Sequence, residues 1–174
     1  ASMAGHLGIS NLCWIYDNNH ITIEGNTALA FSDDVATRFI AYGWNVTRVG
    51  DANDLVMLER AFRTFQKTTD RPTLIIVASH IAYGAPNKQD TSAAHGEPLG
   101  ADEVKATKEA LGWPAEPTFF VSDEVSAEFL RKTKKLARER KKWEKEFAEW
   151  RSRNTQLAEE WERYWSHKLP EGFE

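Results

Sequence analysis

The sequence predicts an α/β fold in which flanking helices cover a parallel sheet, followed by a long helical segment at the carboxyl end. Three apolar runs, 12–16, 44–49 and 73–77, have the length and composition of strands. Helical spacing fills the segments between them, and helix formers dominate after residue 122. The order strand, helix, strand, helix, strand is typical of a parallel sheet with right-handed crossovers.

The first strand is predicted over 12–16. It is apolar throughout, as expected for a strand covered on both faces of a sheet. Residues 1–8 before it resemble the last turns of a helix that ends near Gly5 or Gly8. The polar segment 18–31 after it is expected to form a loop with a short extended piece at 21–23.

Capping residues bracket the next helix. Ser32 is the expected N-cap, and Asp33 and Asp34 in the first turn interact favourably with the helix dipole. Gly43 is expected to end this helix, and the second strand follows over 44–49.

A second helix is expected to begin after Asn53 or Asp54. It carries one apolar stripe at helical spacing, made of Leu55, Leu58, Ala61, Phe62 and Phe65. Pro72 introduces the third strand, 73–77, and a short helix is predicted over 101–111.

From Ser122, a predicted cap, the chain reads as helical to its end. Aromatic and leucine residues recur every seven positions, namely Phe129, Leu136, Trp143, Trp150, Leu157 and Tyr164. This period is compatible with a coiled coil. A coiled coil would also need apolar residues at the intermediate positions of each repeat, where this chain has Arg140 and Asn154. One or two long helices laid against a protein surface are therefore the preferred interpretation.

Composition excludes several classes of protein. The 174 residues carry a formal net charge of −4, which does not suggest a nucleic-acid binder. From residue 123 onward there are 13 basic and 12 acidic residues, against 9 and 14 before it, so the acidic part is the globular candidate. The basic stretch 131–142 could face a nucleic acid or a membrane, but a solvated helix face is favoured.

No apolar run approaches the roughly 18 residues of a membrane span, and no signal-peptide pattern stands at the amino end. Cys13 is the only cysteine and lies in a strand pattern, which favours a buried hydrophobe over a nucleophile. The simplest compartment is therefore the reducing cytoplasm.

The predicted topology brings two distant loops to one edge of the sheet. The loop after the first strand holds Asn19, and the long loop after the third, 78–100, holds Ile81 and His95. Amide and main-chain oxygens at this edge suit a hard cation such as Mg²⁺ that bridges phosphate oxygens. On composition alone, an Asx-rich turn without a metal is the favoured reading of the first loop.

An ordered series of motifs resembles the transketolase family of thiamine diphosphate enzymes. The blocks follow family order across nearly the whole chain, at positions 4–8, 11–12, 16–25, 38–44, 71–75, 81–88, 94–100 and 111–114. The most distinctive are Tyr-Asp-Asn-Asn-His-Ile-Thr-Ile-Glu-Gly at 16–25 and Ala-His-Gly-Glu-Pro-Leu-Gly at 94–100.

The resemblance implies roles for four residues. Asn19 would supply a side-chain ligand to Mg²⁺ (or Ca²⁺) and contact thiamine diphosphate, and Ile21 would supply a main-chain oxygen to the metal. Ile81 would lie against the thiazolium ring, although a loop anchor packed into the core is an equal alternative for it. His95 would contact both cofactor and sugar substrate, and its near-neutral imidazole suits proton transfer as a catalytic residue. A generic loop histidine is more often inert.

The resemblance further implies an incomplete enzyme. Residues 1–121 would be part of the diphosphate-binding domain, and 122–174 a helical linker leading to an absent pyrimidine-binding domain. The family's Gly-Asp-Gly segment, which supplies a third metal ligand, has no match in this sequence. We therefore expect poor metal affinity and no turnover by this chain alone.

The complete enzyme would be a cytoplasmic homodimer of the pentose phosphate pathway that moves a two-carbon ketol unit between sugar phosphates. The absent domains, or a second chain carrying them, would then be partners. Alternatives are another thiamine diphosphate enzyme, such as a deoxyxylulose phosphate synthase or a two-oxoacid dehydrogenase component, or a noncatalytic scaffold that binds a partner through its helical tail.

Two positions depart from the family pattern. Many members have an aspartate where this chain has Ala78, and a glycine where it has Ala82. The first change removes a charge near the predicted active edge, and the second adds a methyl group where close backbone approach or flexibility is common. Both put full activity in question.

Overall fold

The computed structural model describes residues 1–170 and 172–173. The chain divides into two compact units, residues 1–117 and 118–174. The first unit is an α/β unit built on a parallel sheet, and the second is entirely helical in its regular structure. The α/β fold with a long helical carboxyl segment, predicted from the sequence, is confirmed.

The main sheet has three parallel strands in the order β1-β5-β4. These are β1 (Cys13–Asn18), β4 (Asn45–Val49) and β5 (Thr73–Ala78). β5 is the central strand, and its Ile75 is fully buried. The apolar Thr-Leu-Ile-Ile-Val sequence suits this position because both of its faces are covered.

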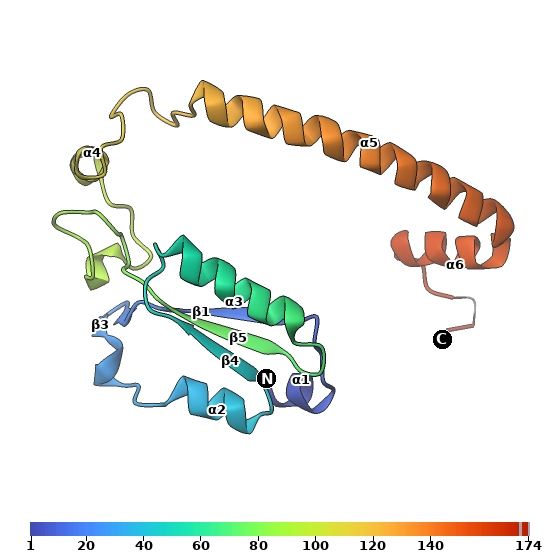
Figure 1. Ribbon diagram of the computed structural model, residues 1–174, viewed down its shortest axis with the longest axis horizontal. Coiled ribbons are helices and arrows are strands. Elements are labelled where there is room, and N and C mark those ends of the chain that lie inside the picture. The colour runs from blue at the N-terminus through green and yellow to red at the C-terminus, as the bar shows by residue number, and fades with distance from the viewer. Residues whose placement is uncertain (171, 174) are drawn as a thin grey trace. The chain divides into compact units, whose positions relative to one another are not determined.

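Two helices cover opposite faces of the sheet, as Figure 1 shows. α3 (Leu55–Lys67) packs on the face that holds the buried cluster Val49, Ala61, Ile75 and Val77. α2 (Val35–Ala41) covers the other face, where the rings of Trp14, Phe39 and Trp44 pack with centroids 5.0–6.1 Å apart.

Shorter elements complete the α/β unit. α1 (Ser2–His6) precedes β1, and a small hairpin of β2 (Ile21–Thr22) and β3 (Gly25–Asn26) follows it, leading into the short helix η1 (Thr27–Leu29). After β5 come η2 (Ser92–Ala94) and α4 (Ala101–Ala110).

Three local predictions were wrong. β1 continues to Asn18 instead of ending at Tyr16, because its register with β5 extends to the pair Asn18 and Ala78. Asp34, not Ser32, caps α2, since its carboxylate accepts hydrogen bonds from the Thr37 backbone N–H and hydroxyl. β1 is not covered on both faces as expected, since its Trp14 and Ile15 are exposed.

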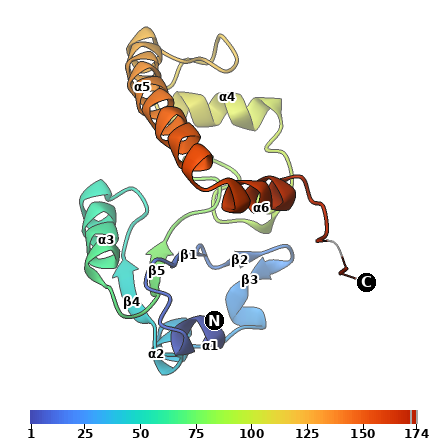
Figure 2. The same ribbon diagram turned by 90° about the vertical axis from the view of Figure 1, so that its right-hand side faces the viewer.

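The helical unit consists of two helices joined by a sharp turn (Figure 2). α5 (Asp123–Arg153) starts at the predicted cap Ser122 and ends at Asn154, where the sequence seam is interrupted. α6 (Thr155–Trp165) folds back on it, with Phe147 and Trp161 in edge contact at 5.7 Å. The two-helix alternative is therefore the observed one.

Candidate functional site

The carboxyl ends of β1 and β5 lie side by side. Asn18 pairs with Ala78 in the parallel register, and the Ser79 backbone N–H donates to the Asn18 carbonyl at 3.4 Å. The loop after β1 and the loop after β5 therefore begin at the same edge of the sheet. Such an edge is where ligands bind in open α/β sheets.

Asn19 begins the loop after β1 and is half-buried. Its Oδ1 accepts a hydrogen bond from the Ile21 backbone N–H at 3.0 Å, which is the Asx turn that its composition allowed. Its Nδ2 donates to Asp17 Oδ2 at 3.4 Å. The amide orientation is thereby defined, with the oxygen turned toward Ile21.

Asp17 joins the two loops. Besides its contact with Asn19, its Oδ1 accepts a hydrogen bond from the Ser79 hydroxyl, the first side chain after β5. This carboxylate was not identified from the sequence, where it seemed part of a turn. A carboxylate directly after an apolar strand run was the available signal.

The donors at this edge match a hard cation in kind but not in number. Asn19 Oδ1 and the Ile21 carbonyl are neutral oxygens, and the former already accepts one hydrogen bond. Within the described residues, no group of three His, Cys, Asp or Glu side chains is placed to hold a metal ion. Tight metal binding would need a further, charged ligand.

His95 lies just past η2 and is half-buried. Its backbone N–H donates to the Ser92 carbonyl at 2.9 Å, but its imidazole Nδ1 is buried and has no hydrogen-bond partner among the described residues. An unpaired buried polar atom costs about 1–3 kcal/mol. The structure therefore leaves this nitrogen unsatisfied by the protein's own described groups.

Ile81 is half-buried in the first turn of the same loop. Its carbonyl accepts a hydrogen bond from the Asp90 backbone N–H at 3.1 Å, so the loop folds back on itself at this point. No hydrogen bond among the described residues joins His95 to Asn19 or to Ile81. The structure thus brings the two loops to one edge without joining these predicted site residues directly.

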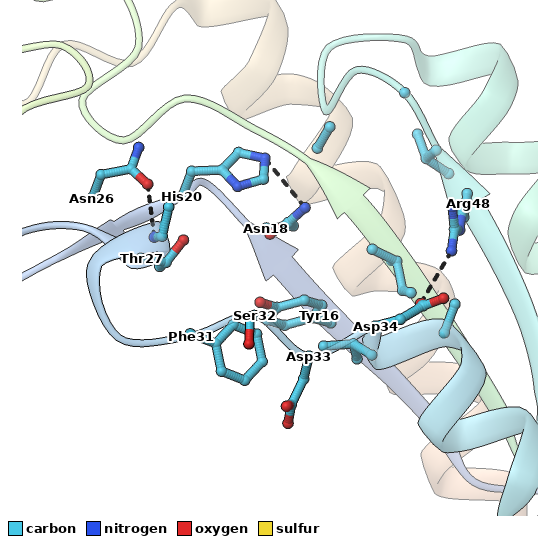
Figure 3. A pocket seen from close by; sticks show the side chains of 17 residues that line it. Tyr16, Asn18, His20, Asn26, Thr27, Phe31, Ser32, Asp33, Asp34 and Arg48 are labelled. Carbon is cyan, nitrogen blue, oxygen red and sulfur yellow. Dashed lines mark hydrogen bonds and ion pairs between the residues drawn. The ribbon is translucent and has the colours of Figure 1, made fainter.

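A cavity of about 500 Å³ opens beside this edge, on the α2 face of the sheet (Figure 3). It is lined by the end of β1, the start of α2 and the end of β4, and the residues labelled there include Tyr16, Asn18, Asp34 and Arg48. Arg48 Nη2 lies 3.6 Å from Asp34 Oδ1 across it. Hydrogen bonds from Thr37 hold the pKa of Asp34 below its usual value.

Sequence reasoning did not identify this cavity. Tyr16, Arg48 and Ile76 share a face only because the strand register aligns them, and the register is not visible in any single segment. Asp33 and Asp34 were seen only as helix-terminal acids. The one available signal was Arg48, a charged residue within the predicted strand.

The two departures from the family pattern have clear places in the structure. Ala78 ends β5 and lines the cavity. Ala82 has a φ of +52°, in the left-handed region that favours glycine. The backbone of Ala82 is therefore in a conformation that its methyl group disfavours.

Among the residues that the structure describes, no helix combines the length and apolar character needed to cross a bilayer.

Comparison with known proteins connects this geometry to one family. Residues 1–170 match the family described as "Transketolase, thiamine diphosphate binding domain". The transketolases of Nostoc sp. and of Geobacillus stearothermophilus are each 42% identical over 175 residues, a match that covers all of this chain and 26% of each relative.

Solved structures agree. A Leishmania mexicana transketolase superimposes with a TM-score of 0.86 at 30% identity, covering 98% of this chain and 26% of that one. A Pichia stipitis transketolase mutant in complex with fructose-6-phosphate gives 0.84 at 35% identity, covering 98% and 25%. The chain spans about a quarter of the length of the relatives it matches.

Proposed function

This chain belongs to the transketolase family, and we propose that it forms the cofactor-binding part of an enzyme that moves a two-carbon ketol unit between sugar phosphates. The matching region is a thiamine diphosphate-binding domain, so thiamine diphosphate is the cofactor that the chain is built to bind. The transfer reaction, the sugar phosphates and the assembly belong to the proposal.

The observation that carries the proposal is the sheet edge at Asn18 and Ala78. Two loops leave it together, one beginning with the oriented Asn19 amide and the other carrying a buried imidazole nitrogen without a partner. An oxygen donor on one of these loops and an unsatisfied imidazole on the other suit an anionic cofactor held through a cation. Buried polar atoms in proteins are as a rule paired, so the unpaired imidazole nitrogen supports a ligand contact.

In the proposed site, Asn19 and the Ile21 carbonyl contribute ligands to Mg²⁺ (or Ca²⁺), and Ile81 provides an apolar surface for the thiazolium ring. His95 forms hydrogen bonds to cofactor and sugar through its imidazole and is the residue of this chain that can move a proton at a substrate hydroxyl. Thiamine diphosphate, when bound, supplies the stabilised carbanion that carbon–carbon bond transfer requires.

We further propose that residues 1–121 belong to the diphosphate-binding domain, that 122–174 act as its helical linker, and that the complete enzyme is a cytoplasmic homodimer. The helical unit supports the linker role: Ala158 is the one buried hydrophobic residue described in it, and large side chains such as Trp143 and Trp165 stay exposed. Such a unit gains stability by covering another protein surface.

The proposal is tested with two proteins. The isolated chain, supplied with thiamine diphosphate, Mg²⁺, xylulose 5-phosphate and ribose 5-phosphate, should form no sedoheptulose 7-phosphate. A chimera in which this chain replaces the matching segment of the Nostoc enzyme should form it. Product from the isolated chain would contradict the expected dependence on further domains.

The chimera also discriminates among the alternatives. A folded chimera that binds thiamine diphosphate by calorimetry but transfers no ketol unit would favour a different thiamine enzyme. A folded chimera that gives no binding heat would favour a noncatalytic scaffold. Circular dichroism and gel filtration against the intact Nostoc enzyme provide the control for folding.

A further inference from the structure

The long loop after β5 is anchored by a carboxylate outside it. Glu103, in the first turn of α4, is 8% exposed although it is an acid. Its Oε1 accepts hydrogen bonds from the backbone N–H groups of Asn87 at 2.8 Å and of Lys88 at 3.1 Å. Its Oε2 accepts one from Asn87 Nδ2 at 2.9 Å.

These bonds fall midway along the loop. Asn87 and Lys88 stand between Ile81 and His95, the two residues of this loop that the proposed site uses. Acidic side chains are rarely buried unless they are paired. Both carboxylate oxygens of Glu103 accept hydrogen bonds from the same short segment of the loop, which indicates a specific structural role. The hydrogen bonds from Asn87 lower the pKa of Glu103, so the carboxylate is ionised at neutral pH.

Further hydrogen bonds within the loop connect Asn87 and Lys88 toward both His95 and Ile81. Toward His95, the Thr91 hydroxyl donates to the Lys88 carbonyl at 2.8 Å, and the Ala94 backbone N–H donates to the Thr91 carbonyl at 3.2 Å. Toward Ile81, Gln89 Oε1 accepts from the Gly84 backbone N–H at 2.8 Å, and the Asp90 backbone N–H bonds the Ile81 carbonyl.

The far end of α4 touches the loop as well. A Cβ on Gly84 would lie 2.7 Å from Cδ2 of Leu111, which follows α4, so the loop backbone passes directly against this side chain. α4 therefore supports the loop at two points, through Glu103 at its first turn and through Leu111 just past its last.

We infer that Glu103 is a positioning residue of the cofactor site: it fixes the loop after β5 so that Ile81 and His95 are held in place before the cofactor binds. The inference rests on the proposed function for its role in catalysis. The anchoring of the loop does not depend on it.

The first test measures the loop in this chain itself, without cofactor. In Glu103→Ala, amide hydrogen exchange at Asn87 and Lys88 should accelerate by about tenfold or more, since two backbone donors lose a charged acceptor. Exchange over 89–95 should rise with it, whereas exchange in β5 should not. Circular dichroism checks that the variant folds.

Two variants serve as controls. Asp102→Ala removes the neighbouring first-turn acid, which is exposed, and should leave loop exchange unchanged. Glu103→Gln keeps an oxygen for both backbone donors but loses the charge, and should lie between the wild type and Glu103→Ala. It remains informative if Glu103→Ala fails to fold.

The second test uses the Nostoc chimera. In Glu103→Ala, the thiamine diphosphate concentration for half-maximal activity should rise by about tenfold, with Glu103→Gln intermediate and Asp102→Ala unchanged. The pH profile of activity should keep its position, because Glu103 anchors the loop and transfers no proton.

The outcomes separate the two proposals. Unchanged loop exchange in both Glu103 variants overturns the inference whatever the chimera does. Raised exchange with an unchanged cofactor requirement in an active chimera also overturns the positioning role. A folded wild-type chimera without ketol transfer overturns the proposed function instead.

Discussion

The loop after β1 and the loop after β5 leave neighbouring strand ends, but they are held by different kinds of contact. The first is ordered by short-range bonds, such as Asn19 Oδ1 to the Ile21 N–H and Asn26 Oδ1 to the Ala28 N–H. The second relies on Glu103, 15 and 16 residues away from the groups it binds. The first loop can therefore form from its own sequence, whereas the second needs α4 in place.

The two loops should accordingly respond differently to substitution. A change in the first loop should stay local, because its bonds span few residues. A change in the second should spread between Ile81 and His95, because one carboxylate anchors the middle of the segment that joins them.

The largest effect is expected for Gly84→Ala. Gly84 has a φ of +84°, and the added Cβ would meet Leu111. Left-handed strain of about 1–2 kcal/mol adds to the cost of moving that side chain, so we expect the free energy of unfolding to fall by about 2 kcal/mol. Hydrogen exchange of the buried β5 amides, followed at increasing urea concentration, measures this free energy.

Gly96→Ala is the matched control for Gly84→Ala. Gly96 also has a positive φ, +79°, but a Cβ there would meet no atom within 4 Å. Gly96→Ala should therefore lose only the free energy of the backbone strain, which is less than Gly84→Ala loses. Equal losses at the two glycines would mean that Leu111 does not support the loop.

Asn19→Ala should have an intermediate effect confined to the first loop. The Ile21 backbone N–H loses its acceptor, which corresponds to about 1 kcal/mol of local stability and several-fold faster exchange at that amide. Exchange at Asn87 and Lys88 should not change. Asn26→Ala, which removes the equivalent bond to Ala28, is the control, and faster exchange at Asn87 in either variant would contradict the local character of this loop.

Ala82→Gly should stabilise the second loop slightly. It relieves a left-handed alanine but increases the entropy of the unfolded chain, which leaves a net gain of about 0.5–1 kcal/mol. The same β5 exchange experiment measures it. Ala85→Gly, at a buried position without a positive φ, should instead lose stability. A loss in both variants would show that Ala82 is not strained.

The smallest effect is expected from acid. Because the folded-state pKa of Glu103 lies below its usual value of 4.5, its contribution is complete above that value and is lost as the pH falls through the folded-state pKa. The thermal midpoint of the wild type should therefore converge on that of Glu103→Gln below pH 4.5. A difference that persists in strong acid would exclude the charge as its cause.

Local sequence signals predicted the elements better than they predicted the contacts. The apolar run of β5 and the Ser122 cap were visible because each depends on a few adjacent residues. The choice of Asp34 over Ser32 as a cap was not, because three adjacent polar residues can each cap a helix and Thr37 decides among them.

The candidate site shows the same limit. That Asn19 and His95 stand on loops from one edge followed from the topology, whereas their roles remain predictions from family resemblance. Asp17, Arg48 and Glu103 gave no comparable signal, because each gains its partner from a separate segment. Glu103 in particular reads in sequence as an ordinary acid in a first helical turn.

The position of β1 at the border of the described sheet has a practical consequence. One of its sides pairs with β5, and no described strand pairs with the other, which lies next to Ile15, a residue that is 57% exposed. Such a border accepts any extended segment that reaches it, including one from another molecule. Purified on its own, this polypeptide should aggregate at high concentration. A charged replacement such as Ile15→Lys should reduce that aggregation.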